Sequence, residues 1–487
     1  MNSLTYYPAK MVYAPSRALQ EGQQLPKGWS AVPILDREEP LKLRWSEAQH
    51  LISRPLPANC RLRIAIAVNY RHAIEVEVFL LKSGTVLDRF DIRYAYVFQP
   101  FELILTSDQA EAVLCEGIGL RLGQGDPPLW IFDELQGDQT RRLFSPHLLI
   151  SEEQSPMGAL LHSTASLSSL QPFGWLEGCV LDGLYALRGV WGADRIDQVL
   201  SEHLGQFLDD DGRLHYEDLY SRKVEGRFTT IEATLPLAVI VKLWPQHPVV
   251  TQALSFWLSE KEGSGLVIDG DTVSAEGAYT VAYPLAAAAA RLHRKELAEL
   301  AVKQLLLRRD RLANDNHIYL RYHQKKGDRS FRSWARAFAW YMLGMTRTWI
   351  ELQASPYADL PGINDIKEEI QRISQVALDW RLSGGLWSCF LDEPATGVEI
   401  SGSAGIATAL ALGARHGLLQ PVYLSAAREA LMALERYITP DGIVSGVAQH
   451  NAGGLELQRC GYRVLSQMGM GLVAQLYALV HSDRSMI

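Results

Sequence analysis

The stretch "SAEGAYTVAYPLAAAAARL", from Ser274 to Leu292, is the least polar helix-forming segment of the chain. A helix that is apolar on all sides is normally buried inside a protein. This one nevertheless starts with a carboxylate, Glu276, followed directly by Gly277. Such an acid is either a solvated cap stabilised by the helix dipole or a catalytic group presented at the mouth of a buried helix.

Helical periodicity continues on both sides of this segment. The predicted helices come in pairs, and the first member of each pair is rich in glycine, alanine and aromatic residues. The second member carries more charge, as in "RKELAELAVKQLLLRRD" at residues 294–310. We therefore expect an inner layer of apolar helices and an outer layer of amphipathic ones.

The mouths of the inner helices recur along the chain at separations of 54, 44, 58, 67 and 67 residues. They lie near Gly178, Glu232, Glu276, Trp334, Ser401 and Met468. A loose repeat of two helices per unit is typical of a helical ring. The pattern predicts a mainly α protein with an (α/α)6 six-hairpin toroid; five outer helices are clear, and the sixth is expected from the stretch before Phe173.

The region from Cys60 to about Ile150 has a different pattern. Short alternating or β-branched runs are separated by turn residues, which predicts an antiparallel β-sandwich. The runs are "CRLRIAIAVN", "AIEVEVFLL", "YVFQPFELILT", "CEGIGLRLG" and "PLWIF". The expected organisation is a β-sandwich accessory domain at 1–155, a linker at 156–172 and a catalytic toroid at 173–487. Because the accessory domain lacks clustered acids and histidines, we expect it to assist folding, oligomerisation or rim construction rather than catalysis.

Composition excludes several classes of protein. The chain has 487 residues and a net charge of −8, whereas a nucleic-acid-binding protein normally shows a basic face. It has neither a segment approaching about 18 apolar residues nor a recognisable secretory signal, so we expect a cytoplasmic protein. The sequence has no HExxH-like cluster, so no catalytic metal is predicted, and no cofactor is implied. The stretch "SGSAG" at 401–405 lacks the first glycine of a GxSxG nucleophile elbow, which argues against a serine hydrolase.

In a toroid the loops before the inner helices converge on one rim, where a pocket forms. The candidate catalytic acids there are Glu276 and Glu232. Aromatic side chains on a polar rim pack against sugar rings, and an arginine binds carboxylates. The candidate substrate-binding residues are His323, Arg336, Trp334, Tyr279, Trp387, Glu399, Ser401 and Trp175. For the aromatic residues the alternative is inner-ring core, for Glu399 and Ser401 it is helix capping, and for His323 and Arg336 it is a structural pair.

The rim motifs resemble a known family. "GLWSCFLDEPATGVEISGSAG" at 385–405, "SWARAFAWYMLGM" at 333–345, "IYLRYHQ" at 318–324 and "AEGAYTVAYPLA" at 275–286 are similar to motifs of the unsaturated glucuronyl and rhamnogalacturonyl hydrolases of glycoside hydrolase families 88 and 105. The resemblance runs from about Gly174 to the C-terminus and implies a six-hairpin toroid. The family's two catalytic aspartates correspond to Glu276 and Glu232, so both acids are one methylene longer here. The family's Arg-Gly-Asn segment corresponds to Arg336, Ala337 and Phe338, so one polar sugar-contacting side chain is missing.

The resemblance implies an exo-acting hydrolase that removes a terminal unsaturated uronic acid from an oligosaccharide, with Glu276 as the proton donor and Glu232 orienting water or ring hydroxyls. Because both acids depart from the family pattern, two alternatives remain. One is a saturated uronide hydrolase, similar to a β-glucuronidase, that uses the two glutamates as a pair. The other is a non-catalytic sugar-binding protein of the same fold. The expected partner is a uronic-acid-bearing oligosaccharide, with a homo-oligomer possible and neither nucleic acid nor membrane involved.

Overall fold

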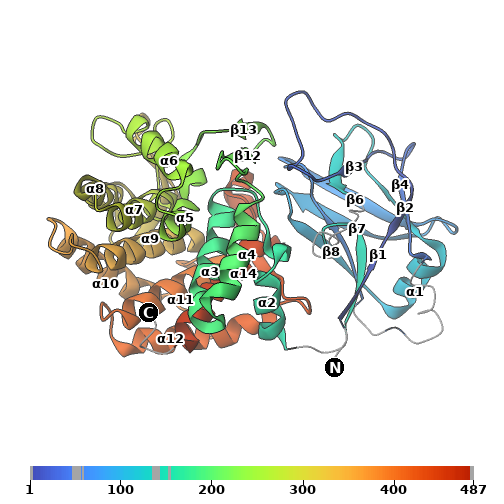
Figure 1. The fold of residues 1–487 in the computed structure, drawn as a ribbon. Helices are drawn as coiled ribbons and strands as arrows, with labels where there is room; N and C mark the ends of the chain where they lie inside the picture. Colours follow the sequence, from blue (N-terminus) through green and yellow to red (C-terminus); the bar gives the residue numbers. More distant parts are fainter. Residues whose placement is uncertain (1–3, 47–55, 57–59, 134–142, 152–154, 483–487) are drawn as a thin grey trace.

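The computed structural model describes residues 4–46, 56, 60–133, 143–151 and 155–482. A β-rich part and a helical part lie side by side (Figure 1), and the chain begins in the β-rich part at the foot of β1. Within the described residues, no helix is both long enough and apolar enough to cross a membrane.

The β-rich part contains two larger antiparallel sheets, ordered β1-β11-β5-β8 and β2-β4-β9-β6-β7, and a two-stranded ribbon of β10 and β3. The strands are β1 (Leu4–Pro8), β2 (Lys10–Tyr13), β3 (Ala31–Ile34), β4 (Leu41–Arg44), β5 (Cys60–Ala65), β6 (Ala73–Leu80), β7 (Val86–Arg93), β8 (Pro100–Leu105), β9 (Ile118–Arg121), β10 (Leu129–Phe132) and β11 (His147–Ser151). All five apolar runs of the sequence contain one of these strands. The β-rich character is confirmed, whereas the face-to-face sandwich stays a prediction.

Two elements of this part do not follow from the apolar pattern. Strand β7 alternates charged residues with buried Phe90 and Ile92, so its partner β6 decides its conformation. Helix α1 (Ser107–Glu116) starts with a capping box, in which the Thr106 hydroxyl accepts from the Gln109 N–H and the Gln109 side chain accepts from the Thr106 N–H.

The helical part forms a closed ring of six inner helices. They are α3 (Trp175–Trp191), α5 (Leu237–Leu243), α7 (Tyr283–Leu292), α9 (Ala335–Gln353), α11 (Ile400–Arg415) and α14 (Gln467–His481). Each packs against the next, and α14 returns to pack against α3. All six predicted inner helices are present, and the mainly helical toroid is confirmed.

Six outer helices pair with these inner ones. They are α2 (Pro156–Thr164), α4 (Ala193–Leu204), α6 (Pro248–Ser259), α8 (Lys295–Leu312), α10 (Ile363–Asp379) and α12 (Pro421–Leu434). Helix α2 packs on α14 and is the sixth outer helix. It lies in the stretch 156–172 that was predicted to be a linker, and η3 (Leu167–Ser169) follows it. The linker assignment is therefore wrong for these residues, because their apolar side chains Leu160, Leu161 and Leu167 are buried.

Short strands and turns form the rim between the helices. They are β12 (His215–Glu217), β13 (Lys223–Glu225), η4 (Ile231–Thr234), β14 (Thr272–Ser274), η5 (Ala278–Ala282), β15 (Ala313–Asn314), β16 (His317–His323), β17 (Asp328–Arg332), β18 (Ser388–Phe390), β19 (Glu393–Val398), η6 (Glu435–Tyr437), β20 (Val444–Ala448), η7 (Asn451–Gly453), α13 (Gly454–Arg459) and β21 (Arg463–Ser466).

Glycines allow the inner helices to approach closely. A Cβ atom on Gly183 of α3 would overlap the backbone of Gly471 of α14, at the place where the ring closes. A Cβ atom on Gly344 of α9 would overlap the backbone of Ala278 and Tyr279. The second contact fixes the turn that follows Glu276.

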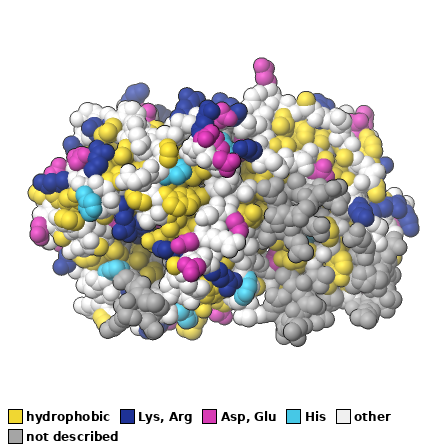
Figure 2. Space-filling model, in the orientation of Figure 1, with side chains coloured by type: hydrophobic (Ala, Val, Ile, Leu, Met, Phe, Trp, Pro, Cys, Tyr) yellow, Lys and Arg dark blue, Asp and Glu magenta, His cyan; other side chains and the backbone are white. Residues whose placement is uncertain are grey.

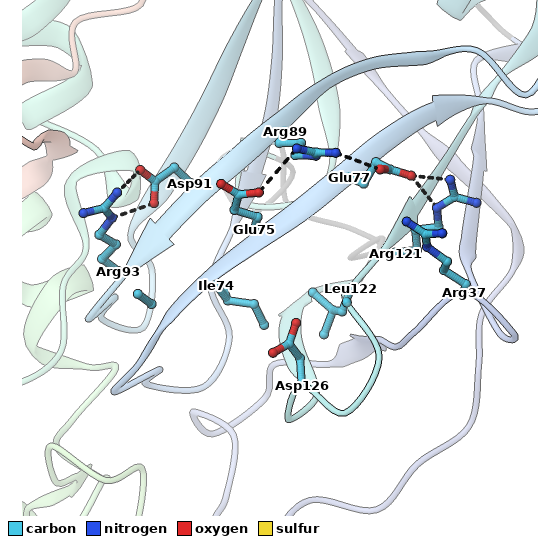
Figure 3. A pocket seen from close by; sticks show the side chains of 12 residues that line it. Arg37, Ile74, Glu75, Glu77, Arg89, Asp91, Arg93, Arg121, Leu122 and Asp126 are labelled. Carbon is cyan, nitrogen blue, oxygen red and sulfur yellow. Dashed lines mark hydrogen bonds and ion pairs between the residues drawn. The ribbon is translucent and has the colours of Figure 1, made fainter.

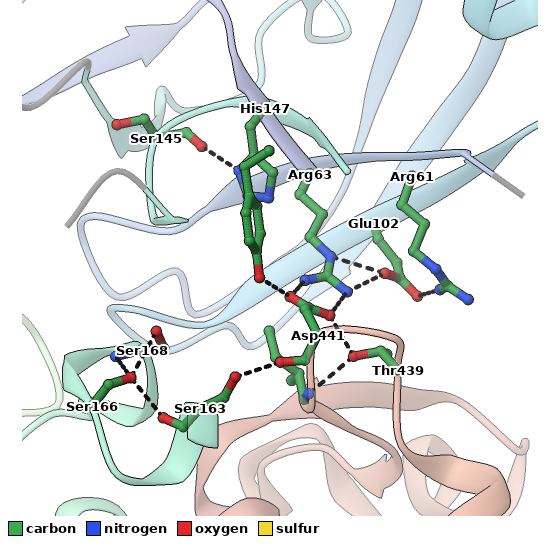
Figure 4. Close-up of polar contacts among 12 residues, drawn as sticks. Arg61, Arg63, Glu102, Ser145, His147, Ser163, Ser166, Ser168, Thr439 and Asp441 are labelled. Atoms are coloured by element: carbon green, nitrogen blue, oxygen red, sulfur yellow. Dashed lines mark hydrogen bonds and ion pairs between the residues drawn. The ribbon is translucent and has the colours of Figure 1, made fainter. Parts of the chain in front are cut away.

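A buried ion pair joins the β-rich part to the helical part (Figure 4). Both guanidinium Nη atoms of Arg63, on β5, donate to the carboxylate of Asp441, which precedes β20. The side chains are only 2% and 4% exposed. Arg63 also donates to Glu102 at 3.0 Å, and the Thr439 hydroxyl donates to Asp441 at 2.7 Å. Burial disfavours the charge of Asp441, but Arg63 more than offsets it and lowers the pKa of that carboxyl.

Two loops of the β-rich part complete this interface. In the loop between β5 and β6, the Asn69 N–H donates to the Ser221 hydroxyl at 2.9 Å and the Asn69 amide donates to the Asp218 carbonyl at 3.1 Å. In the loop between β7 and β8, the Phe98 carbonyl accepts from Gln467 at 2.7 Å. The two loops are thus held against the rim of the ring.

Removing one partner of the Arg63–Asp441 pair leaves an uncompensated buried charge. We expect Arg63→Ala to lower the free energy of unfolding by about 3–5 kcal/mol, measured by chemical denaturation. Arg381→Ala, which removes a more exposed ion pair with Glu429, is the control and should cost at most about 1 kcal/mol. Equal effects of the two substitutions would contradict the assigned role of the buried pair.

Candidate active site

Glu276 and Glu232 lie at the mouths of two neighbouring inner helices. Glu276 follows β14 and directly precedes η5, a π-helical turn that leads into α7. Glu232 lies in η4, which leads into α5 and packs against η5. The Thr234 hydroxyl of η4 donates to the Thr280 carbonyl of η5 at 2.6 Å. The two acids thus belong to adjacent turns joined by a direct hydrogen bond.

A buried arginine holds the segment that carries Glu276. Arg308 of α8 is fully buried, and its Nε donates to the Ser274 carbonyl at 3.2 Å while its Nη2 donates to the Val267 carbonyl at 2.6 Å. A Cβ atom on Gly277 would overlap this guanidinium. Glycine therefore follows Glu276 because the arginine that supports the turn fills the space beside it.

Glu232 is positioned by a second acid, Asp269. The Asp269 carboxylate accepts the Ile231 N–H at 2.9 Å, which fixes the first residue of η4. Burial raises the pKa of Asp269 to about 6, although this hydrogen bond lowers it, and the charge of Glu276 raises it further. Asp269, Glu232 and Glu276 therefore form one electrostatically connected group of carboxyl groups.

Glu232 has a strongly raised pKa. Burial raises the pKa of Glu232 to about 8, and the negative charge of Glu276 is the second cause, while Arg321 and Arg71 act in the opposite direction. Like charges placed close together in a poorly solvated site cannot both ionise easily. Glu232 therefore holds a proton at neutral pH, whereas the sequence analysis assigned the donated proton to Glu276.

Cations and a neutral imidazole surround the pair. Arg336 of α9 stacks 4.6 Å from the Trp334 ring centre, and its Nη2 donates to the carbonyls of Ala448 and Gln449 at 2.8 and 2.7 Å. Burial and the nearby arginines, Arg71 foremost, keep the pKa of His450 well below its usual value. The Ala452 N–H donates to Nδ1 of His450 at 2.9 Å, so the neutral ring carries its proton on Nε2. This nitrogen is a hydrogen-bond donor without a charge.

The β-rich part supplies a tyrosine to this site. Tyr96 lies in the loop between β7 and β8 and contacts the rings of Trp175 at 6.0 Å and His450 at 5.3 Å. Burial raises the pKa of its hydroxyl, which lies within electrostatic range of Arg336, Glu232 and Glu276. Among the described residues, this buried hydroxyl has no hydrogen-bond partner. A sugar hydroxyl or carboxylate would satisfy it.

Trp175 is the predicted aromatic residue with the most favourable position for a sugar. It is partly exposed, at the start of α3, and it lines a hollow together with Tyr216, Glu217, Thr230 and Glu232. Its ring lies 5.6 Å from Trp340 and 5.8 Å from the Arg336 guanidinium. The geometry provides an aromatic surface beside Glu232.

Other predicted residues are enclosed by the protein. Trp387 is fully buried and donates to the Ala377 carbonyl at 2.6 Å. Tyr279 is 1% exposed, stacks between Tyr283 and Trp340, and donates to Asp182. Trp334 is 2% exposed beneath Arg336. These three aromatic side chains are part of the inner-ring core, which agrees with the alternative given for them.

Glu399 caps helix α11, and Ser401 lies in the first turn of that helix. The Glu399 carboxylate accepts from the N–H groups of Ser401, Gly402 and Ala448 at 3.0, 2.6 and 2.9 Å and from the Ser401 hydroxyl at 2.6 Å. Both side chains are fully buried. Four donors thus occupy the carboxylate, and the expectation of substrate contact is corrected to a structural role.

His323 lies at the end of β16, two residues beyond Arg321. Its Nδ1 is 3.2 Å from the Thr272 hydroxyl of β14. Arg321 is directly opposite Ser274 in the same pair of strands, and its Nη2 donates to the Asn451 side chain at 3.4 Å. The positive charge of Arg321 lowers the pKa of Glu232. Arg321 is therefore a better candidate for a substrate-binding residue than His323.

Sequence reasoning missed Tyr96, Arg71, Arg321, His450 and Asp269. "QHNAGGLELQRC" and "DGDTVSAEG" lie in rim loops, and Arg321 adjoins the quoted His323, so position relative to the inner helices could have indicated three of them. Nothing local marks Tyr96 and Arg71, because only the docking of the β-rich part brings them to the ring. Among the described residues, no group of three or more His, Cys, Asp or Glu side chains is arranged to hold a metal ion.

Gly277→Ala tests how the acid-bearing turn is supported. The added methyl group would displace the Arg308 guanidinium, and overpacking of a tight interior costs about 1–3 kcal/mol. We expect a lower melting temperature and a larger loss of kcat than of substrate affinity, because Glu276 moves. Gly263→Ala is the matched control, since its Cβ atom would point into open space. An active, fully stable Gly277→Ala protein would contradict the role assigned to Arg308.

The pKa of Glu232 predicts the pH dependence of activity. A proton donor with a pKa of about 8 is protonated below that pH, so kcat/KM should fall about tenfold per pH unit above it. Folding stability should also decline as the pH rises from the ordinary carboxyl value toward about 8, because only the unfolded chain ionises readily there.

Carbon-13 NMR of the Glu232 carboxyl measures this pKa directly. In Glu276→Gln it should fall, because a neighbouring negative charge is lost. Glu217 is a second buried glutamate, and burial raises its pKa to about 7. Glu217→Gln is therefore the control, and the decline of kcat/KM above pH 8 should persist in that variant. A Glu232 carboxyl that titrates near its ordinary pKa would exclude it as the proton holder.

Comparison with known proteins matches the helical part of the chain. Residues 275–479 match the family model described as Glycosyl Hydrolase Family 88. The match begins one residue before Glu276 and spans a little less than half of the chain, so Glu232 lies outside it. A comparison with curated protein sequences gives no match.

Solved structures share the fold at low sequence identity. A glycoside hydrolase from family 105 of C. acetobutylicum is 16% identical, with a TM-score of 0.58, covering 68% of this chain and 100% of that chain. A possible member of family 105 from Salmonella enterica serovar Paratyphi A is 15% identical, with a TM-score of 0.57, covering 66% of this chain and 92% of that chain. An unsaturated glucuronyl hydrolase specific for heparin is 13% identical, with a TM-score of 0.50 and coverage of 67% and 95%.

Proposed function

Since the chain is a glycoside hydrolase whose residues 275–479 match glycosyl hydrolase family 88, we propose that it removes a terminal unsaturated uronic acid from the end of an oligosaccharide. The observation that carries the proposal is the glutamate pair at the mouths of adjacent inner helices, one member of which has a strongly raised pKa. General acid–base chemistry at neutral pH needs such a pair, with one acid protonated and one ionised.

In the proposed reaction the carboxylic acid of the pair protonates C4 of the C4=C5 double bond. Water adds to C5, and the carboxylate of the pair takes its proton. The hemiketal formed at C5 opens, and the remainder of the sugar chain leaves as an alcohol. Glu232 is the donor because it holds the proton in the resting protein, and Glu276 assists the water.

The surrounding groups bind the uronic acid. The sugar ring packs against Trp175, and the neutral Nε2–H of His450 and the hydroxyl of Tyr96 donate to its oxygens. The positive charges of Arg71, Arg321 and Arg336 favour a carboxylate in a place where Glu232 and Glu276 alone would repel one.

A saturated uronide is the second candidate substrate. Both acids are glutamates, and a protonated and an ionised carboxyl group are also the pair that hydrolyses an ordinary glycosidic bond. Incubation with lyase-produced and saturated uronic-acid oligosaccharides distinguishes the two reactions. Loss of the conjugated enoate absorbance supports the first, release of intact uronic acid supports the second, and absence of both contradicts the assignment to uronides.

Glu276→Gln tests the pair in catalysis. The substitution keeps size and removes the group that accepts a proton from water, so kcat should fall by at least about 10²-fold. Substrate affinity and the melting temperature should change little, as calorimetry and thermal unfolding would show. Glu225→Gln is the matched control. It removes an exposed ion pair with Lys223 and should keep full activity. Near-normal kcat in folded Glu276→Gln would make Glu276 only a cap.

A further inference from the structure

A cleft of about 590 Å³ lies where the β-rich part meets the helical part. This junction cleft has the volume of a ligand pocket. Its lining includes Arg17, Glu21, Asn69, Arg71, Tyr220 and Arg222. Only Tyr220 and Arg222 belong to the helical part. On the surface around β12 and β13, Lys and Arg side chains are mixed with Asp and Glu side chains (Figure 2).

The junction cleft adjoins the hollow that contains Glu232. Asn69 lines both. Arg71 lines the junction cleft and also acts electrostatically on Glu232 and on His450. The two hollows are thus neighbours on either side of Asn69, and an extended ligand bound at Glu232 would reach the junction cleft by passing Asn69.

Arginines and a tyrosine form the far wall. The Tyr220 ring is 56% exposed and lies beneath two guanidinium groups, Arg71 at 5.6 Å and Arg222 at 4.8 Å. Its turn is rigid, because the Asp218 carboxylate accepts from the N–H groups of Tyr220 and Arg222 at 2.8 and 3.0 Å. The wall is thus in place before a ligand binds.

The positive charge of the junction cleft is only partly neutralised. Arg222 pairs with Asp218 at 2.8 Å, whereas Nη1 of Arg71 is buried and has no hydrogen-bond partner among the described residues. A hollow on β6 and β7 behaves differently (Figure 3). There Arg89 and Arg121 pair with Glu77, and Arg93 pairs with Asp91. The lining of that hollow has as many arginines as acidic residues. In the junction cleft, Arg17, Arg71 and Arg222 outnumber the one lining carboxylate, Glu21, so that cleft favours an anion.

We propose that the junction cleft binds the anionic part of the oligosaccharide beyond the bond that is cleaved, with its carboxylate or sulfate groups on Arg17, Arg71 and Arg222. A sugar ring packs on the exposed edge of Tyr220. The inference deepens the proposed function and rests on it. It also gives the β-rich part a role in selecting substrates by the charge of their second and later sugars.

The test compares kcat/KM for substrates of two lengths. An unsaturated disaccharide places little beyond the cleaved bond, whereas tetrasaccharides reach the junction cleft. Three tetrasaccharides with the same terminal residue are used: one sulfated, one with carboxylates only, and one neutral beyond its first residue. We expect Arg17→Ala and Tyr220→Ala each to lower kcat/KM about tenfold for the anionic tetrasaccharides and to leave the disaccharide within about twofold. Arg44→Ala, which removes an exposed cation of β4, should change neither.

Each outcome decides the proposal. A greater loss on the sulfated or on the carboxylated tetrasaccharide supports it and identifies the anion. In Arg17→Ala, an equal loss on the neutral tetrasaccharide overturns it. In either variant, a loss on the disaccharide or no loss on any tetrasaccharide also overturns it. Calorimetry on Glu276→Gln with the same tetrasaccharides separates this proposal from the proposed reaction. If the tetrasaccharides bind in a way that depends on Arg17 and Tyr220, but the wild-type protein does not turn them over, only the proposed reaction is contradicted.

Discussion

The buried ion pair between Arg63 and Asp441 determines how the two parts of the chain meet. Two charges out of contact with water are tolerated only when they neutralise each other with good geometry, and here two guanidinium nitrogens face two carboxylate oxygens. Few other orientations of β5 would bring these two groups together with this geometry, so the pair fixes the orientation of β5 on the ring. The loops that carry Arg71 and Tyr96 adjoin β5 and β8 of the same sheet, and this docking brings both residues to the rim that holds Glu232 and Glu276.

In the candidate active site, unfavourable and favourable electrostatic interactions partly offset each other. Glu232, Glu276 and Asp269 would repel one another if all three were ionised, and burial adds to that cost. Arg71 and Arg321 offset part of it, and a proton on Glu232 removes more. The fold keeps this unfavourable group in place through contacts that take no part in chemistry, such as Arg308 beneath Gly277 and Thr234 on Thr280.

The sequence predicted the ring better than the site. The inner helices were predictable because an all-round apolar composition has one physical explanation, burial, and because six such segments recur. Glu232 and Glu276 were found as charges at their mouths. Trp387, Glu399 and Ser401 show the limit, since the residue types that bind sugars also fill cores and cap helices. Tyr96 and Arg71 were beyond reach, because their position depends on Arg63 meeting a residue 378 positions away. The proton on Glu232 depends likewise on burial that no motif encodes.

The division of labour between the two parts follows from these contacts. The ring supplies the two glutamates, Trp175 and His450, which the proposed reaction uses at the end of a sugar chain, and the β-rich part adds Tyr96 and Arg71. The ring fold does not by itself determine which oligosaccharide binds, because specificity is a difference in affinity among competing ligands. The groups that could discriminate are those that face the ligand away from the cleaved bond. In the proposed junction cleft they come mainly from the β-rich part. Under the two proposals, a change in that part should alter the preferred substrate while the reaction assigned to Glu232 and Glu276 stays the same.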